Sequence, residues 1–295
     1  MRTPAEFGPL PEVTLREGMR SFEADGFAVL EGVLGSEARA ALLAAARRLA
    51  AQHDFAADRA VFRTDDRDAG RDEAFFASAR GVRGFLEAGA VDEAGSLQVP
   101  PDRALNKIGH ALHDLVPEVR ALATSALVRD AFQIAGLEDA LLVQSMLIFK
   151  QPGIGGEVRW HQDASYLRSD PQRVAGLWFA LEDADRSNGC LWMVPGAHRG
   201  PLRERYAVDW AKREGTLGTV DSTSWPAEGA VPLEVPAGSV VVFHDHMPHR
   251  SDANHSSRSR VALTLHAHNR AAAWCEDNWL QRGDLDPFVV TGTGA

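Results

Sequence analysis

The stretch Val158-Arg159-Trp160-His161-Gln162-Asp163 combines a strand-like pattern with two side chains that bind metals. If these residues are extended, His161 and Asp163 point to the same side, because side chains alternate along a strand. One imidazole and one carboxylate, joined by a distant histidine, make the facial triad that binds non-haem Fe(II) and leaves positions open. An isolated His-x-Asp pair is weak evidence, since His161 also suits a hydrogen-bonded strand position and Asp163 a turn.

Three histidines compete for the place of the third ligand. Residues 238–243 are apolar and β-branched and indicate a strand, and His244 and His246 stand at its end. His249 follows a proline, where a new strand has to start. We select His249 because the next predicted strand begins with Arg260, which can return to the same pocket. His244 and His246 are then at most neighbours of the metal ligands.

Arg260 needs an anion if it is buried, because a guanidinium is always charged and its planar fork matches a carboxylate. One end of a dicarboxylate would satisfy it. The alternative is a surface salt bridge, and for Arg258, which lies in the loop before the strand, we prefer that alternative.

The pattern along the chain predicts helices first and strands afterwards. Ser36 is expected to cap a helix that runs to His53, and Pro117 and Gly136 bracket a second amphipathic helix. From residue 141 onwards, Gly, Pro and Asn turns separate short apolar segments. We predict strands at residues 141–150, 158–163, 174–181, 190–194, 231–235, 239–243 and 260–267.

Many short strands behind a helical N-terminal part indicate a mainly β fold, a two-layered sandwich or barrel with flanking helices. We find no internal repeat and no flexible linker. The chain of 295 residues, 45% of them hydrophobic, is therefore expected to form a single domain over residues 1–295. Its helical part would span about residues 14–137 and its strand-rich core about residues 141–270.

Ordered motifs over roughly residues 20–288 resemble the phytanoyl-CoA dioxygenase family of Fe(II)/2-oxoglutarate oxygenases. Within that family, the motifs are most similar to the group of phytanoyl-CoA dioxygenase domain-containing protein 1. The motifs are NKIGHALH (106–113), QSMLIFKQP (144–152), GGEV (155–158), HQD (161–163), LWFALEDA (177–184), NGCLW (188–192), PGAH (195–198), HRS (249–251) with Arg260, and EDNWL (276–280).

The resemblance implies a double-stranded β-helix, or jelly roll, that binds Fe(II) through His161, Asp163 and His249. It also implies contacts to the cosubstrate 2-oxoglutarate from Lys107, Met146, Trp178, Ser251 and Arg260. Ser251 and Arg260 would hold the distal carboxylate, and Lys107 would neutralise charge from the N-terminal side of the barrel mouth. Trp178 and Met146 would wall the carbon chain, since a mostly apolar lining keeps water away.

The activity that the resemblance implies is hydroxylation of a C–H bond in a small organic substrate, consuming O₂ and releasing succinate and CO₂. The carboxylate of Asp163 argues against halogenation, because a small side chain there would open a halide site. Trp160 departs from the family pattern, in which we expect a small residue or proline, and its ring could narrow the pocket mouth. Two alternatives stay open: a non-catalytic metal- or metabolite-binding jelly roll, and a metal-dependent cupin enzyme that needs no Lys107/Arg260 pair.

Composition sets the expected partners and compartment. The net charge of −10 argues against nucleic acid, whose binding requires clustered cations. We find no apolar run of membrane-spanning length, and no apolar leader in residues 1–13. Cys190 and Cys275 form no Cys-x-x-Cys pair and are expected to be thiols of a cytoplasmic protein. We therefore expect a small-molecule substrate and neither a nucleic-acid nor a membrane partner.

Residues 200–230 are expected to form a long loop, which is usually functional or disordered in a compact domain. The loop holds Tyr206, Trp210 and Trp225, which either cover a substrate or only anchor the loop. We predict that His110 and His113 lie on a helical segment, where packing or a supporting role outweighs direct metal binding. We identify no basic patch for the phosphates of a CoA ester.

Overall fold

The computed structural model describes residues 7–55, 58, 60–62, 73–92 and 94–292. Its helices are α1 (Glu12–Asp25), α2 (Ser36–Ala51), α3 (Glu73–Ala77), α4 (Leu112–Leu115), α5 (Pro117–Ala123) and α6 (Ala126–Ile134). Across these ranges, no helix has both the length and the apolar character needed to cross a membrane. Part of the stretch 1–13, in which we expect no leader, lies outside the described residues.

The strands alternate with turns along most of the chain. They are β1 (Phe27–Leu30), β2 (Val61–Phe62), β3 (Val82–Glu87), β4 (Leu105–His110), β5 (Ala140–Lys150), β6 (Val158–His161), β7 (Ser169–Asp170), β8 (Val174–Ala180), β9 (Leu191–Met193), β10 (Glu204–Asp209), β11 (Glu214–Thr219), β12 (Val231–Leu233), β13 (Val240–His244), β14 (His249–Ser251), β15 (Arg260–Asn269), β16 (Ala273–Trp274) and β17 (Phe288–Val289). Six of the seven predicted strands correspond closely to β5, β8, β9, β12, β13 and β15.

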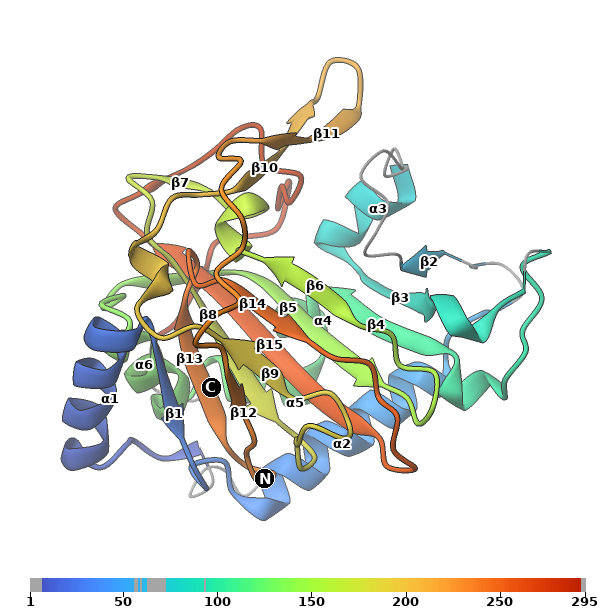
Figure 1. Cartoon of the computed structure of the whole chain (residues 1–295), viewed down its shortest axis with the longest axis horizontal. Helices are drawn as coiled ribbons and strands as arrows, with labels where there is room; N and C mark the ends of the chain where they lie inside the picture. Colours follow the sequence, from blue (N-terminus) through green and yellow to red (C-terminus); the bar gives the residue numbers. More distant parts are fainter. Residues whose placement is uncertain (1–6, 56–57, 59, 63–72, 93, 293–295) are drawn as a thin grey trace.

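Two sheets face each other to form the jelly roll (Figure 1). The larger sheet has the order β1-β13-β8-β15-β5-β4-β3-β2, with β17 beside β5, and the smaller sheet has the order β12-β9-β14-β6. The helices α2, α5 and α6 pack against the face of the larger sheet that is turned away from the smaller one. The predicted fold class, a mainly β jelly roll with flanking helices, is confirmed.

The larger sheet is covered on both faces, which explains why its central strands are apolar almost throughout. In β8, Leu177 and Phe179 pack with the helices, whereas Trp178 faces the smaller sheet. The same alternation holds in β13, where Val242 belongs to the helical side and Val241 to the space between the sheets. The site described below occupies one end of that space.

The N-terminal part is less helical than predicted. Strand β1 lies between α1 and α2 and pairs with β13 at one edge of the larger sheet, while β3 and β4 extend the sheet beyond β5. The expectation that strands begin only after residue 140 is therefore wrong. His110 is also misplaced by the prediction, because it ends β4 and does not lie on a helix; His113 does lie on one, the short α4.

Two details of the predicted helices are also wrong. Ser36 is the first residue of α2, and Gly35 occupies the N-cap position without a side-chain bond. The single helix expected between Pro117 and Gly136 is two helices, because Ser125 adopts an extended conformation and its side chain accepts a hydrogen bond from the Val128 amide. A side chain that caps the following turn breaks the helix at that point.

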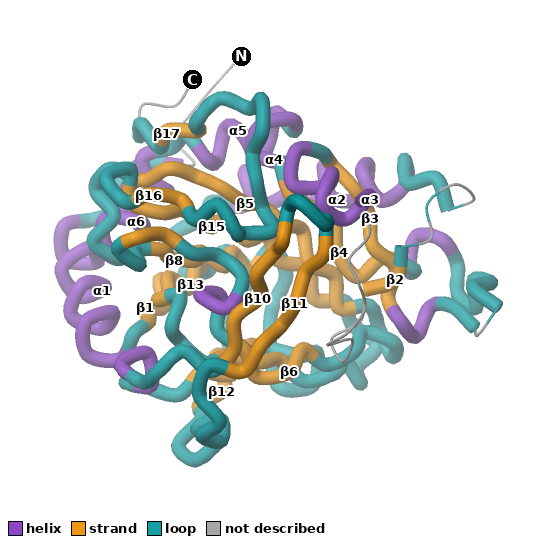
Figure 2. Tube along the Cα trace, turned by 90° about the horizontal axis from the view of Figure 1, so that it is seen from above, coloured by secondary structure: helices purple, strands orange, loops and turns teal. Residues whose placement is uncertain are grey.

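Residues 200–230 are not a plain loop, because they contain the antiparallel hairpin of β10 and β11. Seen from above, the hairpin runs across the middle of the molecule between β15 and β4 (Figure 2). Tyr206 and Val208 of β10 are buried in a cluster with Leu167 and Trp279. The hairpin is thus packed against the barrel.

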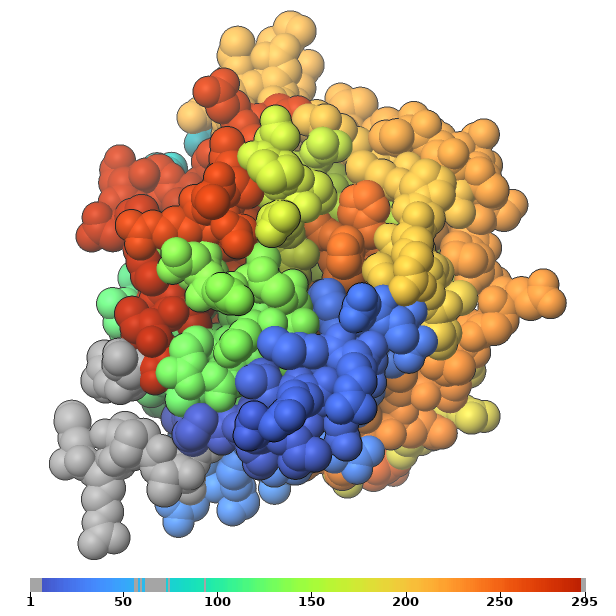
Figure 3. Space-filling model, turned by 90° about the vertical axis from the view of Figure 1, so that its left-hand side faces the viewer, coloured from blue at the N-terminus to red at the C-terminus, as the bar shows by residue number. Residues whose placement is uncertain are grey.

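Helix α1 closes one side of the molecule. On the face shown in Figure 3, this blue segment packs beside the green segment that contains α6. Gly18 of α1 allows the close approach, since a Cβ there would lie 2.6 Å from Cδ1 of Ile134. The buried Asp130 of α6 accepts a hydrogen bond from the Leu10 amide at 2.8 Å, which holds the chain before α1 in place.

Candidate metal centre and cosubstrate pocket

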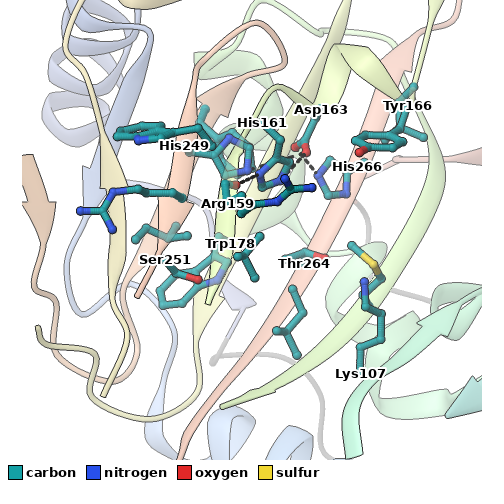
Figure 4. A pocket seen from close by; sticks show the side chains of 18 of the residues that line it. Lys107, Arg159, His161, Asp163, Tyr166, Trp178, His249, Ser251, Thr264 and His266 are labelled. Carbon is teal, nitrogen blue, oxygen red and sulfur yellow. Dashed lines mark hydrogen bonds and ion pairs between the residues drawn. The ribbon is translucent and has the colours of Figure 1, made fainter. Parts of the chain in front are cut away.

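A cavity of about 860 Å³ opens at one end of the space between the two sheets. Its wall contains all eight residues that the sequence predicts for metal and cosubstrate binding: Lys107, Met146, His161, Asp163, Trp178, His249, Ser251 and Arg260. Figure 4 shows His161, Asp163 and His249 close together on one side of the cavity, with Trp178, Ser251, Thr264 and Lys107 on the other. A cavity of this size accommodates a cosubstrate and a small substrate together.

The three predicted metal ligands meet around one point. One ligand atom from each of His161, Asp163 and His249 lies within 4.8 Å of the other two. Oδ1 of Asp163 is 3.8 Å from Nε2 of His161 and 3.7 Å from Nε2 of His249. Two imidazole nitrogens and one carboxylate oxygen at these separations could hold a single Fe(II), with its remaining positions facing the cavity.

The backbone explains why these ligands meet. Strand β14 pairs with β6, so that His249 stands opposite His161 and their ring centroids are 4.1 Å apart. Strand β6 ends at His161, and Asp163 begins a 3₁₀ turn, so the prediction of a strand over residues 158–163 is wrong at its end. Gln162 between them is extended, which brings Asp163 back to the side of His161.

Both histidines are oriented to offer Nε2 to a metal. Nδ1 of His161 lies 2.8 Å from the carbonyl of Arg159, and Nδ1 of His249 lies 2.9 Å from the carbonyl of Met247. A carbonyl only accepts, so Nδ1 carries the proton and Nε2 carries the free lone pair. Burial and the neighbouring His249 lower the pKa of His161 to about 4, so it is neutral at physiological pH.

His266 holds the carboxylate of Asp163 from the other side. Its Nε2 lies 2.9 Å from Oδ2 of Asp163, which leaves Oδ1 directed at the two ligand histidines. Burial alone would raise the pKa of Asp163, but His266 and the ligand histidines lower it well below its usual range. The group is therefore ionised at neutral pH and offers one oxygen atom to a cation.

The register of the larger sheet builds the wall of the cosubstrate pocket. Thr264 of β15 stands opposite both Met146 of β5 and Trp178 of β8, and Gly109 of β4 stands opposite Met146. Side chains in one such row share a face of the sheet. The thioether of Met146, the hydroxyl of Thr264 and the indole of Trp178 therefore lie side by side in the cavity wall.

Arg260 is the most deeply buried charge of this wall. Only 1% of its surface is exposed, and its guanidinium carbon lies 5.4 Å from the centre of the Trp178 ring. Its Nε and Nη1 have no hydrogen-bond partner among the described residues. Burial lowers the pKa of Arg260 to about 10, so it remains charged at neutral pH. The alternative of a surface salt bridge is wrong for Arg260.

A buried cation with two unused donors fits a carboxylate that is supplied from outside the chain. Thr264 has a buried hydroxyl that also lacks a partner among the described residues, and Ser251 lies in the same part of the cavity (Figure 4). Lys107 reaches the cavity from β4. The residues present thus fit both a divalent metal and a dicarboxylate.

The outer part of the cavity is rich in aromatic side chains. Phe75 and Trp279 lie with ring centroids 4.5 Å apart, and Tyr166 and Tyr206 lie 6.0 Å apart. Trp160, the departure from the family pattern, lies at the wall of the cavity, where Arg250 stands 5.5 Å from its ring centre.

Gln162 connects the metal-binding turn to two neighbouring segments. Its Nε2 donates to the carbonyls of His246 at 2.9 Å and Pro201 at 3.1 Å, and its Oε1 accepts from the Arg203 amide at 2.9 Å. Gln162 is only 1% exposed, so these bonds are shielded from water. It therefore links β6 both to the turn before His249 and to the start of the β10–β11 hairpin.

The remaining predicted positions fall outside the metal centre. His244 and His246 lie beyond the cavity, where His244 contacts His198 with ring centroids 5.4 Å apart. His113 is packed against the hydroxyl of Ser145, its Nδ1 2.7 Å from Oγ. Arg258 forms an exposed ion pair with Asp185, so the prediction of a surface salt bridge is confirmed for this residue.

The sequence reasoning missed Thr264 and His266. Both follow Arg260 on the same strand at even spacing, so a side-chain period of two places all three on one face. Extending the period from Arg260 would have identified them. Gln162 gives no comparable signal, because a glutamine beside a metal ligand has no characteristic spacing.

Comparison with known proteins shows the family of this chain. The family profile described as "Phytanoyl-CoA dioxygenase (PhyH)" matches residues 22–262. Phytanoyl-CoA dioxygenase domain-containing protein 1 of Mus musculus is 38% identical over 278 residues, which cover 92% of this chain and 96% of the mouse protein.

Solved structures show a related fold. EctD from S. alaskensis, with 2-oxoglutarate and 5-hydroxyectoine, has a TM-score of 0.64 at 22% identity, over 98% of this chain and 91% of that one. The non-heme alpha ketoglutarate dependent carbocyclase SnoK from nogalamycin biosynthesis has a TM-score of 0.64 at 20% identity, over 95% and 94%. The resemblance derived from the motifs is confirmed. The chain belongs to the phytanoyl-CoA dioxygenase family of Fe(II)/2-oxoglutarate-dependent oxygenases.

Proposed function

We propose that this protein is an Fe(II)- and 2-oxoglutarate-dependent dioxygenase that hydroxylates a C–H bond of a small organic substrate. The observation that supports it most is the pairing of two features in one cavity. The His161, Asp163 and His249 ligand set stands on one side, and Arg260, a buried cation with two unused donors, stands on the other. With Fe(II), 2-oxoglutarate and O₂ bound, such a site couples decarboxylation to succinate and CO₂ with oxidation of a substrate.

Each residue has a distinct role in the proposed reaction. His161, Asp163 and His249 would hold Fe(II), and His266 holds Oδ2 of Asp163, so that Oδ1 would be left for the metal. Arg260, aided by Ser251 and Thr264, would anchor the distal carboxylate of 2-oxoglutarate. Fixing the cosubstrate at its far end would orient its reacting end towards the metal. This orientation lowers the entropic part of the activation barrier of the reaction.

The remaining cosubstrate contacts neutralise charge and exclude water. Lys107 would offset the negative charge of the dicarboxylate, since its ammonium points into the cavity (Figure 4). Trp178 and Met146 would cover the carbon chain from the sheet. A dry wall strengthens the electrostatic contacts and limits side reactions with solvent.

The outer cavity is the proposed substrate chamber. Tyr166 and Arg159 are seen close to the metal ligands in Figure 4, and Phe75, Tyr206 and Trp279 belong to the same wall. Aromatic walls with a few polar groups are typical of sites for small organic molecules. The carboxylate of Asp163 supports hydroxylation over halogenation, because it fills the position that a halide would need.

The test is an anaerobic titration of metal-free protein with Fe(II) and 2-oxoglutarate. A keto acid chelated to Fe(II) gives a visible charge-transfer band, and we expect this band for the native chain. Asp163→Ala should abolish the band, and Arg260→Ala should shift its appearance to higher 2-oxoglutarate concentration. Fe(II) binding without any band would refute the proposal and favour a non-catalytic binding protein or an enzyme without this cosubstrate.

A further inference from the structure

Lys150 is an almost fully buried lysine that the proposed reaction does not use. Only 2% of its surface is exposed. Its Nζ donates to the carbonyls of Gly156 at 2.5 Å, Asp252 at 2.7 Å and Ser251 at 3.4 Å. These three bonds use all the donors of an ammonium group, and they tie the end of β14 to the turn before β6.

The position of Lys150 links it to the proposed cosubstrate anchor. Lys150 is the register partner of Arg260 in the β5–β15 pair, and it holds the backbone of Ser251. Its stem packs closely on Gly189, where a Cβ would lie 2.9 Å from Cδ of Lys150. Close packing of the stem and three bonds to carbonyls hold the ammonium at this position.

Charges from several elements act on Lys150. Arg260 of β15 repels its ammonium, whereas Glu87 at the end of β3, Asp252 after β14 and Glu157 before β6 attract it. Together these effects disfavour the protonated amine. Burial is the largest cause and repulsion by Arg260 the second, and they lower the pKa of Lys150 to about 7. In the absence of a bound anion, protonated and neutral forms therefore coexist near neutral pH.

We propose that Lys150 is a positioning residue of the cosubstrate anchor, and that a dicarboxylate bound at Arg260 is accompanied by uptake of a proton at Lys150. The proposal rests on the function proposed above. The anion cancels the repulsion from Arg260, so the protonated amine becomes the stable form. The protonated amine in turn keeps all three carbonyls bonded, and so fixes the backbone that carries Ser251.

Linkage gives the direction of the pH effect. A bound carboxylate raises the pKa of Lys150, so the cosubstrate binds more tightly to the protonated form. Below about pH 7 the amine is already charged and affinity is independent of this group. Above that pH, Kd rises by up to about tenfold per pH unit until the raised pKa is reached, because one proton is taken up per ligand.

The chain offers a direct measurement, because it has only three lysines, Lys107, Lys150 and Lys212. We would label their ε-carbons with ¹³C and follow the three NMR signals against pH in Zn(II)-loaded protein, with and without 2-oxoglutarate. Lys150→Arg assigns the Lys150 signal. Lys212, which is exposed beside Asp209, is the internal control.

We expect the Lys150 signal to titrate near pH 7 without 2-oxoglutarate and at least one pH unit higher with it, while the Lys212 signal does not move. Calorimetry between pH 6.5 and 9 should show Kd rising for the native chain and staying flat for Lys150→Arg, whose side chain is always charged. Lys150→Met should bind more weakly than the native chain at pH 6.5, with an equally flat profile.

Three results would overturn the inference. A Lys150 midpoint that is the same with and without 2-oxoglutarate, while the cosubstrate binds, overturns proton uptake and leaves the proposed function standing. A failure of 2-oxoglutarate to bind at any pH overturns the proposed function and this inference with it. A Lys150→Arg profile as steep as that of the native chain would assign the linkage to another group and refute the role of Lys150.

Discussion

Replacing Arg260 with methionine should have opposite effects on stability and on cosubstrate binding. The guanidinium is 1% exposed, and its Nε and Nη1 have no hydrogen-bond partner among the described residues. Folding therefore removes a charge from water without an ion partner, and this burial lowers the pKa of Arg260 to about 10. Arginine is protonated in both the folded and the unfolded chain at neutral pH, so the lowered pKa means that the charge opposes folding.

The magnitudes follow from these observations. A lowered arginine pKa of this kind corresponds to about 2–4 kcal/mol of lost stability. Methionine would remove this cost of burying a charge. It would also remove the contact between the guanidinium and the Trp178 ring at 5.4 Å, which contributes about 1–2 kcal/mol. We expect the metal-free Arg260→Met chain to be as stable as the native chain, or more stable by about 1–2 kcal/mol.

Binding should change in the other direction. Two hydrogen bonds from a charged donor contribute about 1.5–3 kcal/mol each. Their loss weakens 2-oxoglutarate binding by about 3–6 kcal/mol, or roughly 10²- to 10⁴-fold in Kd. Urea denaturation of metal-free protein measures the first effect, and anaerobic titration of the Fe(II)-loaded protein measures the second.

Arg258→Met is the matched control, because Arg258 is exposed and paired with Asp185 at the surface. It should change stability by less than about 1 kcal/mol and leave Kd unchanged. The reasoning is refuted if Arg260→Met destabilises the metal-free chain by more than about 2 kcal/mol while Kd stays within about threefold of the native value. Arg260 would then be a structural cation.

Three further predictions concern the scaffold. Ser125→Ala should lower the free energy of unfolding by about 1 kcal/mol because it removes the cap of α6, whereas Ser36→Ala, which removes no capping bond, should cost less; urea denaturation compares the two. Burial lowers the pKa of His113 to about 4, below its unfolded value of 6.5, so the unfolded chain takes up a proton first as pH falls. Stability should then decline by about 3 kcal/mol between pH 6.5 and pH 4, and His113→Asn should lack that share of the decline in denaturation curves recorded across this range. Gln162→Leu should lower the free energy of unfolding by about 2–4 kcal/mol, because three shielded hydrogen bonds are lost. The variant should also increase proteolysis of the β10–β11 hairpin. A hairpin as resistant to proteolysis as in the native chain would contradict the linking role of Gln162.

The sequence predicts the metal centre well because its chemistry is concentrated in few residues. His161 and Asp163 are two positions apart in the chain, and the distal motif narrows the third ligand to a choice among His244, His246 and His249. We select His249 because the next predicted strand begins with Arg260. The structure brings this histidine to His161 and Asp163. Asp163 lies on the side of His161 as predicted, but it does so from a turn after the strand and not from the strand itself.

The parts that could not be predicted depend on contacts between distant segments. Strand β1 is a four-residue apolar segment between helices, and its pairing with β13 joins positions more than two hundred residues apart. A short apolar run of this kind does not distinguish a strand from a helix. The burial of Lys150 could not be predicted from the sequence either, because it results from contacts with β14, Gly189 and the turn at Gly156.

The most direct test of the central claim is release of ¹⁴CO₂ from 1-¹⁴C-labelled 2-oxoglutarate by the Fe(II)-loaded protein in the presence of O₂. We predict that release requires both Fe(II) and O₂ and is lost in Asp163→Ala, because that variant removes the carboxylate from the ligand set. Absence of release from the native protein across a panel of small organic substrates, although Fe(II) and 2-oxoglutarate are both bound, would contradict the account. Release at the native rate from Asp163→Ala would contradict it equally.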